Sequence, residues 1–282
     1  MVVAGEKSKL IIVGTQELRK RKLGGDIRSI EVDGKTVPES PSEKLLGVII
    51  NNKLTWHEHL YGEMWRTKED NSKGLLPQLS QRVGILTKLS NYTSKKKLRM
   101  LISGIFYSKL FYCLPLFLNT WNLDNYRDGR QCFTSYTKED NRRIQVLQNK
   151  VSRLLLDRQE RGRILQHKQN MSTEELLEKT GFLSIHQLGA KNTLVMMKKI
   201  MLSRKPKYLA DRILPSQVDR ITRSGTSLIT IKTSLNLRRS SFLYRGMKLY
   251  NQLPEPIRKI EKIDNFKEEV HVWVKLNVRV KP

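Results

Sequence analysis

Four pairs of adjacent carboxylates are the side chains of this chain best suited to metal-dependent chemistry: Glu69-Asp70, Glu139-Asp140, Glu174-Glu175 and Glu268-Glu269. Two-metal phosphoryl transfer needs carboxylates that converge on two ions about 3.5–4 Å apart. Neighbouring residues of a helix point about 100° away from each other, so such a pair cannot serve one site. The sequence therefore predicts neither polymerase nor nuclease activity for this chain alone.

The histidines and cysteines do not form a zinc-binding pattern either. His57 and His59 have no matching pair of cysteines or third ligand, so we expect a capping or surface role for them. Cys113 and Cys132 are the only cysteines, too few for a disulfide framework, which favours a reducing compartment. We expect no metal or other cofactor in this chain.

The charge of the chain indicates its partner. Fifty-three Lys and Arg against 27 Asp and Glu give a net charge of +26 over 282 residues. A field of this size attracts polyanions, which makes nucleic acid the expected ligand and anionic membrane the main competitor. The amino terminus has no secretory pattern, so we expect an intracellular protein, in the nucleus, the cytoplasm or both, and not a secreted one.

One apolar stretch, residues 100–121, resembles a membrane span. Lys109 lies near its middle, where a charge costs about 2.5–3.5 kcal/mol in lipid. We therefore predict a buried helix that Pro115 kinks or ends, and no membrane insertion, although a membrane-associated helical protein stays open as a third hypothesis.

The elements that would hold these residues change in type along the chain. Residues 8–13 read as a strand, and residues 30–37 alternate apolar with polar across Asp33-Gly34, a hairpin signal. Residues 45–50 form an apolar run typical of a strand buried on both faces. From Trp56 onward apolar residues recur at helical spacing.

Helix boundaries carry local signals as well. Thr93 or Ser94 is a plausible cap, and residues 138–158 carry a stripe formed by Ile144, Leu147, Val151, Leu154 and Leu155. Ser172 to Glu175 resembles a capping box, and Gly181 would end that short helix. Further helices are expected over residues 184–203, 208–214, 240–253 and 263–276, with a possible strand over 228–235.

A series of motifs in order resembles one enzyme family. The start Gly5-Glu6-Lys7-Ser8-Lys9 and the segment Leu45-Leu46-Gly47-Val48, followed by Leu54-Thr55-Trp56 and His59, are similar to the last palm segments of LINE-type, non-LTR retroelement reverse transcriptases. Arg82 to Leu86, which leads into the apolar helix expected to end at Trp121, is similar to the family's thumb, and Leu147 to Leu155 is similar to its Leu-Gln-x-x-Ala-x-Arg helix. Thr222-Arg223-Ser224-Gly225 and Ser241 to Pro254 resemble the distal carboxyl-terminal block.

The resemblance implies a binding function without the chemistry. In the family, the Tyr/Phe-x-Asp-Asp hairpin that holds the catalytic Mg²⁺ lies before the segment that Gly5 begins, and this chain has no such signature. We therefore expect this chain to be the template- and primer-binding portion of an RNA-directed DNA polymerase. The expected partners are RNA, an RNA/DNA template-primer and the palm and fingers portion of the enzyme, which this chain lacks. An independent basic RNA-binding protein derived from a retroelement is the alternative.

The expected fold is mainly α with a small amino-terminal β portion. We expect a palm-edge β remnant over residues 1–55, a helical thumb-like domain over 56–160 and a basic, mostly helical region over 161–282. The residues expected to contact nucleic acid are Lys7, Lys9, Lys44, Leu46, Gly47, Arg142, Arg143, Lys150, Arg153, Arg238, Arg239 and Arg245.

Overall fold

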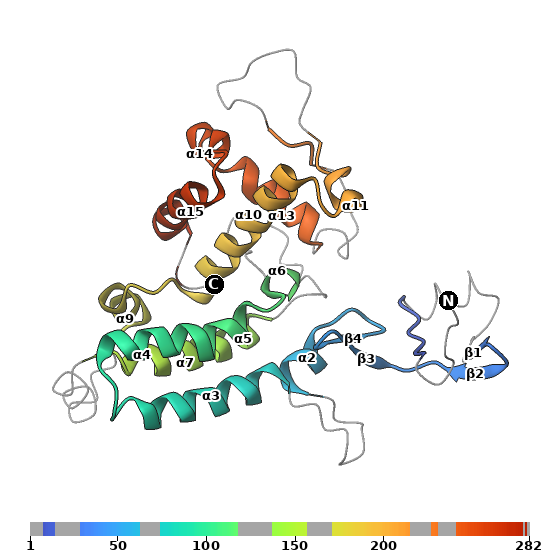
Figure 1. Ribbon diagram of the computed structural model, residues 1–282, viewed down its shortest axis with the longest axis horizontal. Coiled ribbons are helices and arrows are strands. Elements are labelled where there is room, and N and C mark those ends of the chain that lie inside the picture. Colours follow the sequence, from blue (N-terminus) through green and yellow to red (C-terminus); the bar gives the residue numbers. More distant parts are fainter. Residues whose placement is uncertain are drawn as a thin grey trace. The chain divides into compact units, whose positions relative to one another are not determined.

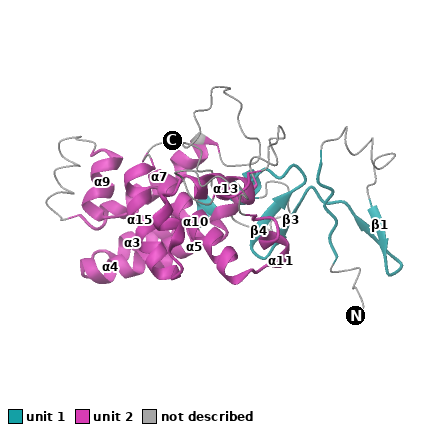
Figure 2. Cartoon of the chain, turned by 90° about the horizontal axis from the view of Figure 1, so that it is seen from above, with its two compact units in different colours: residues 1–78 teal, residues 79–282 magenta. Residues whose placement is uncertain are grey.

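The computed structural model describes residues 8–14, 29–62, 74–117, 137–156, 171–214, 227–230, 241–278 and 280. These residues form two compact units, 1–78 and 79–282, and the boundary between them falls inside helix α3, Leu75–Leu89. Figure 2 colours the two units separately. The three regions expected from the sequence have boundaries at 55/56 and 160/161, and hydrogen bonds described below join residues on either side of each boundary.

The first unit contains two antiparallel hairpins and a short helix. Its elements are β1 (Ser29–Val32), β2 (Lys35–Pro38), β3 (Ser42–Leu45), β4 (Val48–Asn51) and α2 (His57–Tyr61). The predicted turn at Asp33-Gly34 is confirmed: both residues have positive φ, 51° and 69°, as a two-residue hairpin turn of matching twist requires.

Two strand predictions in this unit were wrong. Residues 8–14 contain only an isolated parallel bridge from Leu10 to Glu39. Residues 45–50 are not one buried strand but the tip of the β3–β4 hairpin, because Leu46 and Gly47 both take positive φ and reverse the chain. Hydrophobicity was misleading here, since only Val48 and Ile49 of the apolar run are buried.

The second unit is helical. After α3 come α4 (Lys95–Leu101), the π-helix η3 (Ile102–Tyr107), α5 (Ser108–Phe111), α6 (Leu114–Phe117), α7 (Lys138–Arg153), α9 (Thr173–Thr180), α10 (Ile185–Ser203), α11 (Lys207–Ala210), α13 (Phe242–Asn251), α14 (Glu255–Lys259) and α15 (Ile263–Asn277). The expectation of a mainly helical chain with a small amino-terminal β portion is confirmed (Figure 1).

Side-chain caps mark five of the described helix starts. Ser94, Thr137, Ser172, Ser184 and Ser241 each accept a hydrogen bond from a backbone N–H of the first turn of the helix that follows. The predicted capping box at Ser172 is present, and Gly181 ends α9 with φ 67°, a left-handed value that glycine adopts without strain.

Pro115 ends the central helix, as its chemistry requires. The helical run from α4 through α5 stops at Phe111, the residue whose carbonyl the proline ring would crowd. Tyr112 is extended and Cys113 has φ 56°, after which Pro115 lies in the first turn of α6. Among the helices that the structure describes, none is long and apolar enough to cross a membrane.

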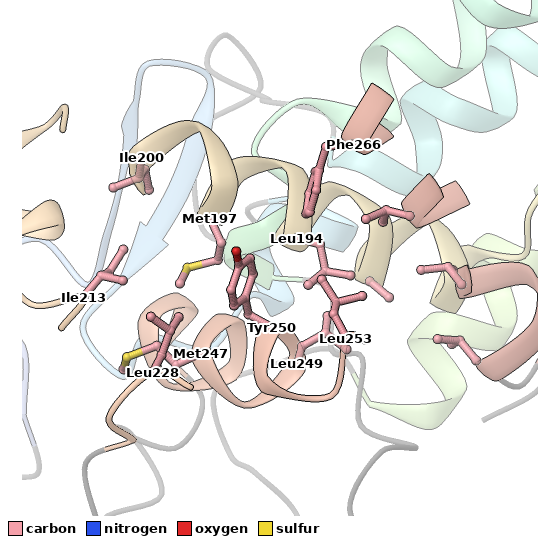
Figure 3. Packing of buried hydrophobic residues seen from close by; sticks show 14 of the residues in the cluster. Leu194, Met197, Ile200, Ile213, Leu228, Met247, Leu249, Tyr250, Leu253 and Phe266 are labelled. Carbon is pink, nitrogen blue, oxygen red and sulfur yellow. The ribbon is translucent and has the colours of Figure 1, made fainter. Parts of the chain in front are cut away.

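The main core of the second unit lies around α10. Leu194, Met197 and Ile200 of α10 pack with Met247 and Tyr250 of α13 and with α15, which supplies Phe266, Val270 and Val274 (Figure 3). Leu228 is buried in the same cluster, but residues 227–230 contain a bridge and no strand. Because each of these side chains is at most 6% exposed, this core can hold the carboxyl-terminal helices together.

Candidate nucleic-acid interface

The β3–β4 hairpin presents three of the predicted contacts at one tip. Lys44 is exposed on β3, and Leu46 is 82% exposed at φ 48° beside Gly47 at φ 84°. A bulky apolar residue with positive φ is uncommon and stores backbone strain. The tip therefore places an apolar side chain in solvent two residues after an exposed cation, so that the hairpin could touch a base or sugar and a phosphate together.

The base of the hairpin is fixed to α2. The buried His59 Nδ1 accepts a hydrogen bond from Ile49 N at 3.4 Å. Asn51 Nδ2 donates to Thr55 Oγ1 and to Glu58 Oε2, each at 2.6 Å. His59 thus supports β4 from the interior, and neither capping nor surface placement describes it. These contacts also cross the expected boundary at residues 55/56.

Helix α7 carries four more predicted contacts, and they are not equivalent. The side chains of Arg142 and Arg143 are 67% and 52% exposed. Both form an ion pair with Glu139, with Arg142 Nε 2.7 Å from Oε2 and Arg143 Nε 3.2 Å from Oε1. Their hydrogen bonds, that from Arg142 above all, lower the pKa of Glu139 to about 2. Lys150 is exposed and Arg153 half-buried. The surface of α7 is cationic, but two of its three arginines already share one carboxylate.

The buried face of α7 differs from the predicted stripe. Ile144 and Val151 are fully buried as expected, whereas Leu147, Leu154 and Leu155 are only half-buried. Polar residues complete the buried face, and Gln148 Nε2 donates to Tyr107 Oη at 2.8 Å and to Leu183 O at 2.7 Å. Sequence reasoning missed this hub, because a glutamine among leucines gives no periodic signal.

The hydrogen bonds of α7 bring distant segments together. Gln145 Oε1 accepts from Ile185 N at 3.0 Å, and Asn149 Nδ2 donates to Thr173 Oγ1 at 2.9 Å. Arg99 of α4 donates to Thr180 O at 2.7 Å and lies over the Phe182 ring at 4.7 Å. Contacts of this kind cross the expected boundary at residues 160/161 and make α7 a scaffold as well as a surface.

Arg245 lies inside the protein. It is 7% exposed, and its guanidinium donates to Pro115 O and Leu116 O, both at 3.1 Å. Those carbonyls belong to α6, so Arg245 fastens α13 to α6. A side chain placed in this way supports the fold, and we no longer count it among residues that could meet a phosphate.

Three exposed lysines begin α4. Lys95, Lys96 and Lys97 follow the Ser94 cap, and the first turn contains no acidic residue. Lysines at a helix amino terminus repel the positive end of the helix dipole, so they do not stabilise α4. Lys9 is likewise exposed in the first unit. Lys7, Arg238 and Arg239 lie outside the described residues, as do Glu69-Asp70 and Cys132.

Three of the described carboxylates that the sequence paired have local roles. Asp140 accepts from Thr137 N at 2.8 Å and Glu175 from Ser172 N at 3.1 Å, so each completes a capping box. Glu139 is held by two arginines. Within the described ranges, no group of three or more His, Cys, Asp or Glu side chains is placed to hold a metal ion.

Comparison with protein-family models, with curated proteins and with solved structures finds no match for this chain.

Proposed function

We propose that this chain is the template- and primer-binding portion of a LINE-type retroelement reverse transcriptase, and that it synthesises no DNA alone. The observation that carries the proposal is the ordered series of sequence motifs from Lys7 to Pro254, together with a net charge of +26. The exposed cations of β3, α4 and α7 support it, because they give the charge several surfaces on which phosphates can bind.

In this proposal the hairpin and α7 have different tasks. Lys44, Leu46 and Gly47 support the primer end, with the exposed leucine against a sugar or base and the lysine on a phosphate. Arg142, Arg143, Lys150 and Arg153 follow the phosphates of template and primer. Mg²⁺ and its carboxylates belong to the palm and fingers portion, which is the protein partner in this proposal.

Binding is tested first, by a salt titration of the purified chain with a labelled RNA/DNA hybrid. The logarithm of the affinity should fall by about 0.7–0.9 per logarithmic unit of salt for every phosphate contacted. A matched variant, Arg142→Gln with Lys150→Gln, should lower the slope by about two such contacts. Absence of binding, or binding that does not depend on salt, would refute the proposal.

The enzyme family is tested by supplying the upstream palm and fingers portion in trans. We expect metal-dependent DNA synthesis from the mixture and from neither part alone. Leu46→Asn is the informative variant, because asparagine suits φ 48° and should preserve the hairpin while removing the apolar contact. Synthesis that is unchanged by Leu46→Asn would remove the primer-end assignment, and synthesis by the purified chain alone would remove the whole proposal.

An independent RNA-binding protein is the second candidate, and the self-contained core around α10 favours it. Such a protein should prefer one RNA over an excess of bulk competitor RNA. A template-binding portion should show no such preference, so a competition assay separates the two.

A further inference from the structure

Helices α10 and α15 lie against each other in antiparallel directions along a seam of paired residues. Gln187, in the first turn of α10, donates to Val278 O at 2.9 Å, just beyond the end of α15. One turn later Lys191 meets His271, and Lys198 lies over the Phe266 ring at 5.4 Å. Residues of increasing number on α10 therefore contact residues of decreasing number on α15. The order of the residues along the exposed edge of the seam follows from this.

That edge carries a row of basic side chains. Lys267, His271 and Lys275 are spaced by four residues, so they share one face of α15. Lys191 joins them from α10, with its Nζ 3.2 Å from His271 Nδ1. We call these four residues the seam cluster. All four have some solvent exposure, Lys275 the most.

The seam cluster has an unusual internal contact. A lysine ammonium can only donate hydrogen bonds, so the contact with Lys191 requires Nδ1 of His271 to accept. Burial lowers the pKa of both residues, and repulsion adds to this: from Lys267 on Lys191, and from Lys191 and Lys275 on His271. These effects favour the neutral imidazole, whereas a negative ligand would favour its protonated form.

One carboxylate pairs with a lysine of the seam cluster: Asp264 Oδ1 lies 2.7 Å from Lys267 Nζ, and Lys199 also acts on Asp264. Glu268 and Glu269 are exposed on the same helix. The charged groups that act on the contact between Lys191 and His271 are lysines: Lys267 lowers the pKa of Lys191, and Lys191 and Lys275 lower that of His271. A phosphate would supply a counter-charge for Lys191 and Lys275.

We propose that the seam cluster is a binding site for the phosphates of a nucleic-acid strand, which deepens the function proposed above and rests on it. From Lys267 to Lys275 the helix rises about 12 Å, over which one strand of a duplex presents roughly three to four phosphates. A row of this length can meet successive phosphates of one polynucleotide strand.

The first test is a salt titration of the full chain with a fluorescently labelled oligouridylate, followed by anisotropy. Lys191→Gln with Lys275→Gln should lower the salt slope by about 1.4, which is two single-strand contacts. The control, Lys205→Gln with Lys207→Gln, removes the same charge from exposed positions of the same unit and should leave the slope near that of wild type. Equal losses in both variants, or an unchanged slope in the first, would overturn the proposal.

The second test uses the titration of His271, followed by NMR and assigned with His271→Gln. Oligouridylate should raise the pKa of His271, and affinity should strengthen as the pH falls through that pKa. Lys191→Arg keeps the charge and should retain the binding, which separates loss of contact from misfolding. A titration of His271 that is insensitive to oligouridylate, or a pH dependence that persists in His271→Gln, would overturn the proposal.

The outcomes separate the two proposals. Binding by the wild type with no effect of the cluster variants removes this site and leaves the proposed function. No binding of oligouridylate or RNA/DNA hybrid by the wild type removes both. Cluster-dependent binding to phosphatidylserine vesicles, with no cluster-dependent binding to oligouridylate, would replace the nucleic acid by a membrane surface.

Discussion

At the scale of single residues, arginine occurs in this chain both as an exposed surface cation and as a buried structural group. Arg142 extends into solvent beside Glu139, whereas Arg245 is buried on two carbonyls of α6. In the sequence both are arginines of a basic helix, and no local pattern separates them. The difference comes from the packing of α13 on α6, two elements about 130 residues apart, which a reading of local periodicity cannot reach.

Arg245→Ala should lower the free energy of unfolding by about 2–4 kcal/mol, because it removes a buried guanidinium that donates to two part-buried backbone carbonyls. The salt slope of RNA binding by the folded variant should not change. Chemical denaturation and a binding titration measure the two quantities, with Arg142→Ala as the exposed control, expected to affect binding and not stability. A stable Arg245→Ala protein with a reduced slope would contradict the buried role.

Glu139→Gln should strengthen nucleic-acid binding by up to about fivefold, the range of an exposed ion pair. The substitution removes the carboxylate that holds Arg142 and Arg143, so that it no longer competes with a phosphate for them. Anisotropy with labelled RNA at low and high salt measures the gain, which should shrink as salt screens the charges. Weaker binding would mean that Glu139 orients the arginines for the ligand.

At the scale of elements, the sequence correctly predicts helix ends and turns that depend only on neighbouring residues. Ser172, Gly181 and Ser184 mark helix ends because capping needs only the neighbouring backbone, and Asp33-Gly34 suits its turn. The Leu46-Gly47 turn was missed because leucine is a poor residue for positive φ. Gln148 was missed because two of its partners, Tyr107 and Leu183, lie on other segments, 41 and 35 residues away. Long-range polar contacts leave no trace in local spacing.

Gly246→Ala tests the packing of α13 on α10. A Cβ at Gly246 would lie 2.6 Å from Met197 Sδ and 2.7 Å from its Cγ, so Met197 must move. We expect a loss of about 1–3 kcal/mol in unfolding free energy, despite the better helix propensity of alanine. In Gly246→Ala with Met197→Ala the two effects should be less than additive, as a double-mutant cycle by denaturation can measure.

At the scale of the whole molecule, charge and core are arranged in different ways. The basic residues are spread over β3, α4, α7 and the seam cluster, whereas the largest described core is confined to residues 190–278. Composition alone predicts a polyanionic ligand. It cannot identify the lysines that could contact a phosphate, because this depends on which carboxylates already take part in helix caps and ion pairs.

A chain shortened to residues 74–282, which keeps α3 whole, should fold cooperatively without the hairpins. The physical reason is that the core around α10 and the hydrogen bonds of Gln148 and Arg245 lie entirely within it. Thermal denaturation and amide exchange check this, with the full chain as reference. Loss of a cooperative transition would show that residues 1–73 contribute to that core.

The π-helix η3 determines which side chains of the helical run from α4 to α5 face the interior. Leu98, Ile102, Phe106 and Leu110 are all buried, at strict intervals of four. In an uninterrupted α-helix, steps of four residues drift by about 40° each, and such a row would soon leave the interior. The wider π turn reverses part of that drift. Chain length within 102–107 is therefore as strongly constrained as residue identity: removing a single residue there would turn every later side chain of the helix by about 100°.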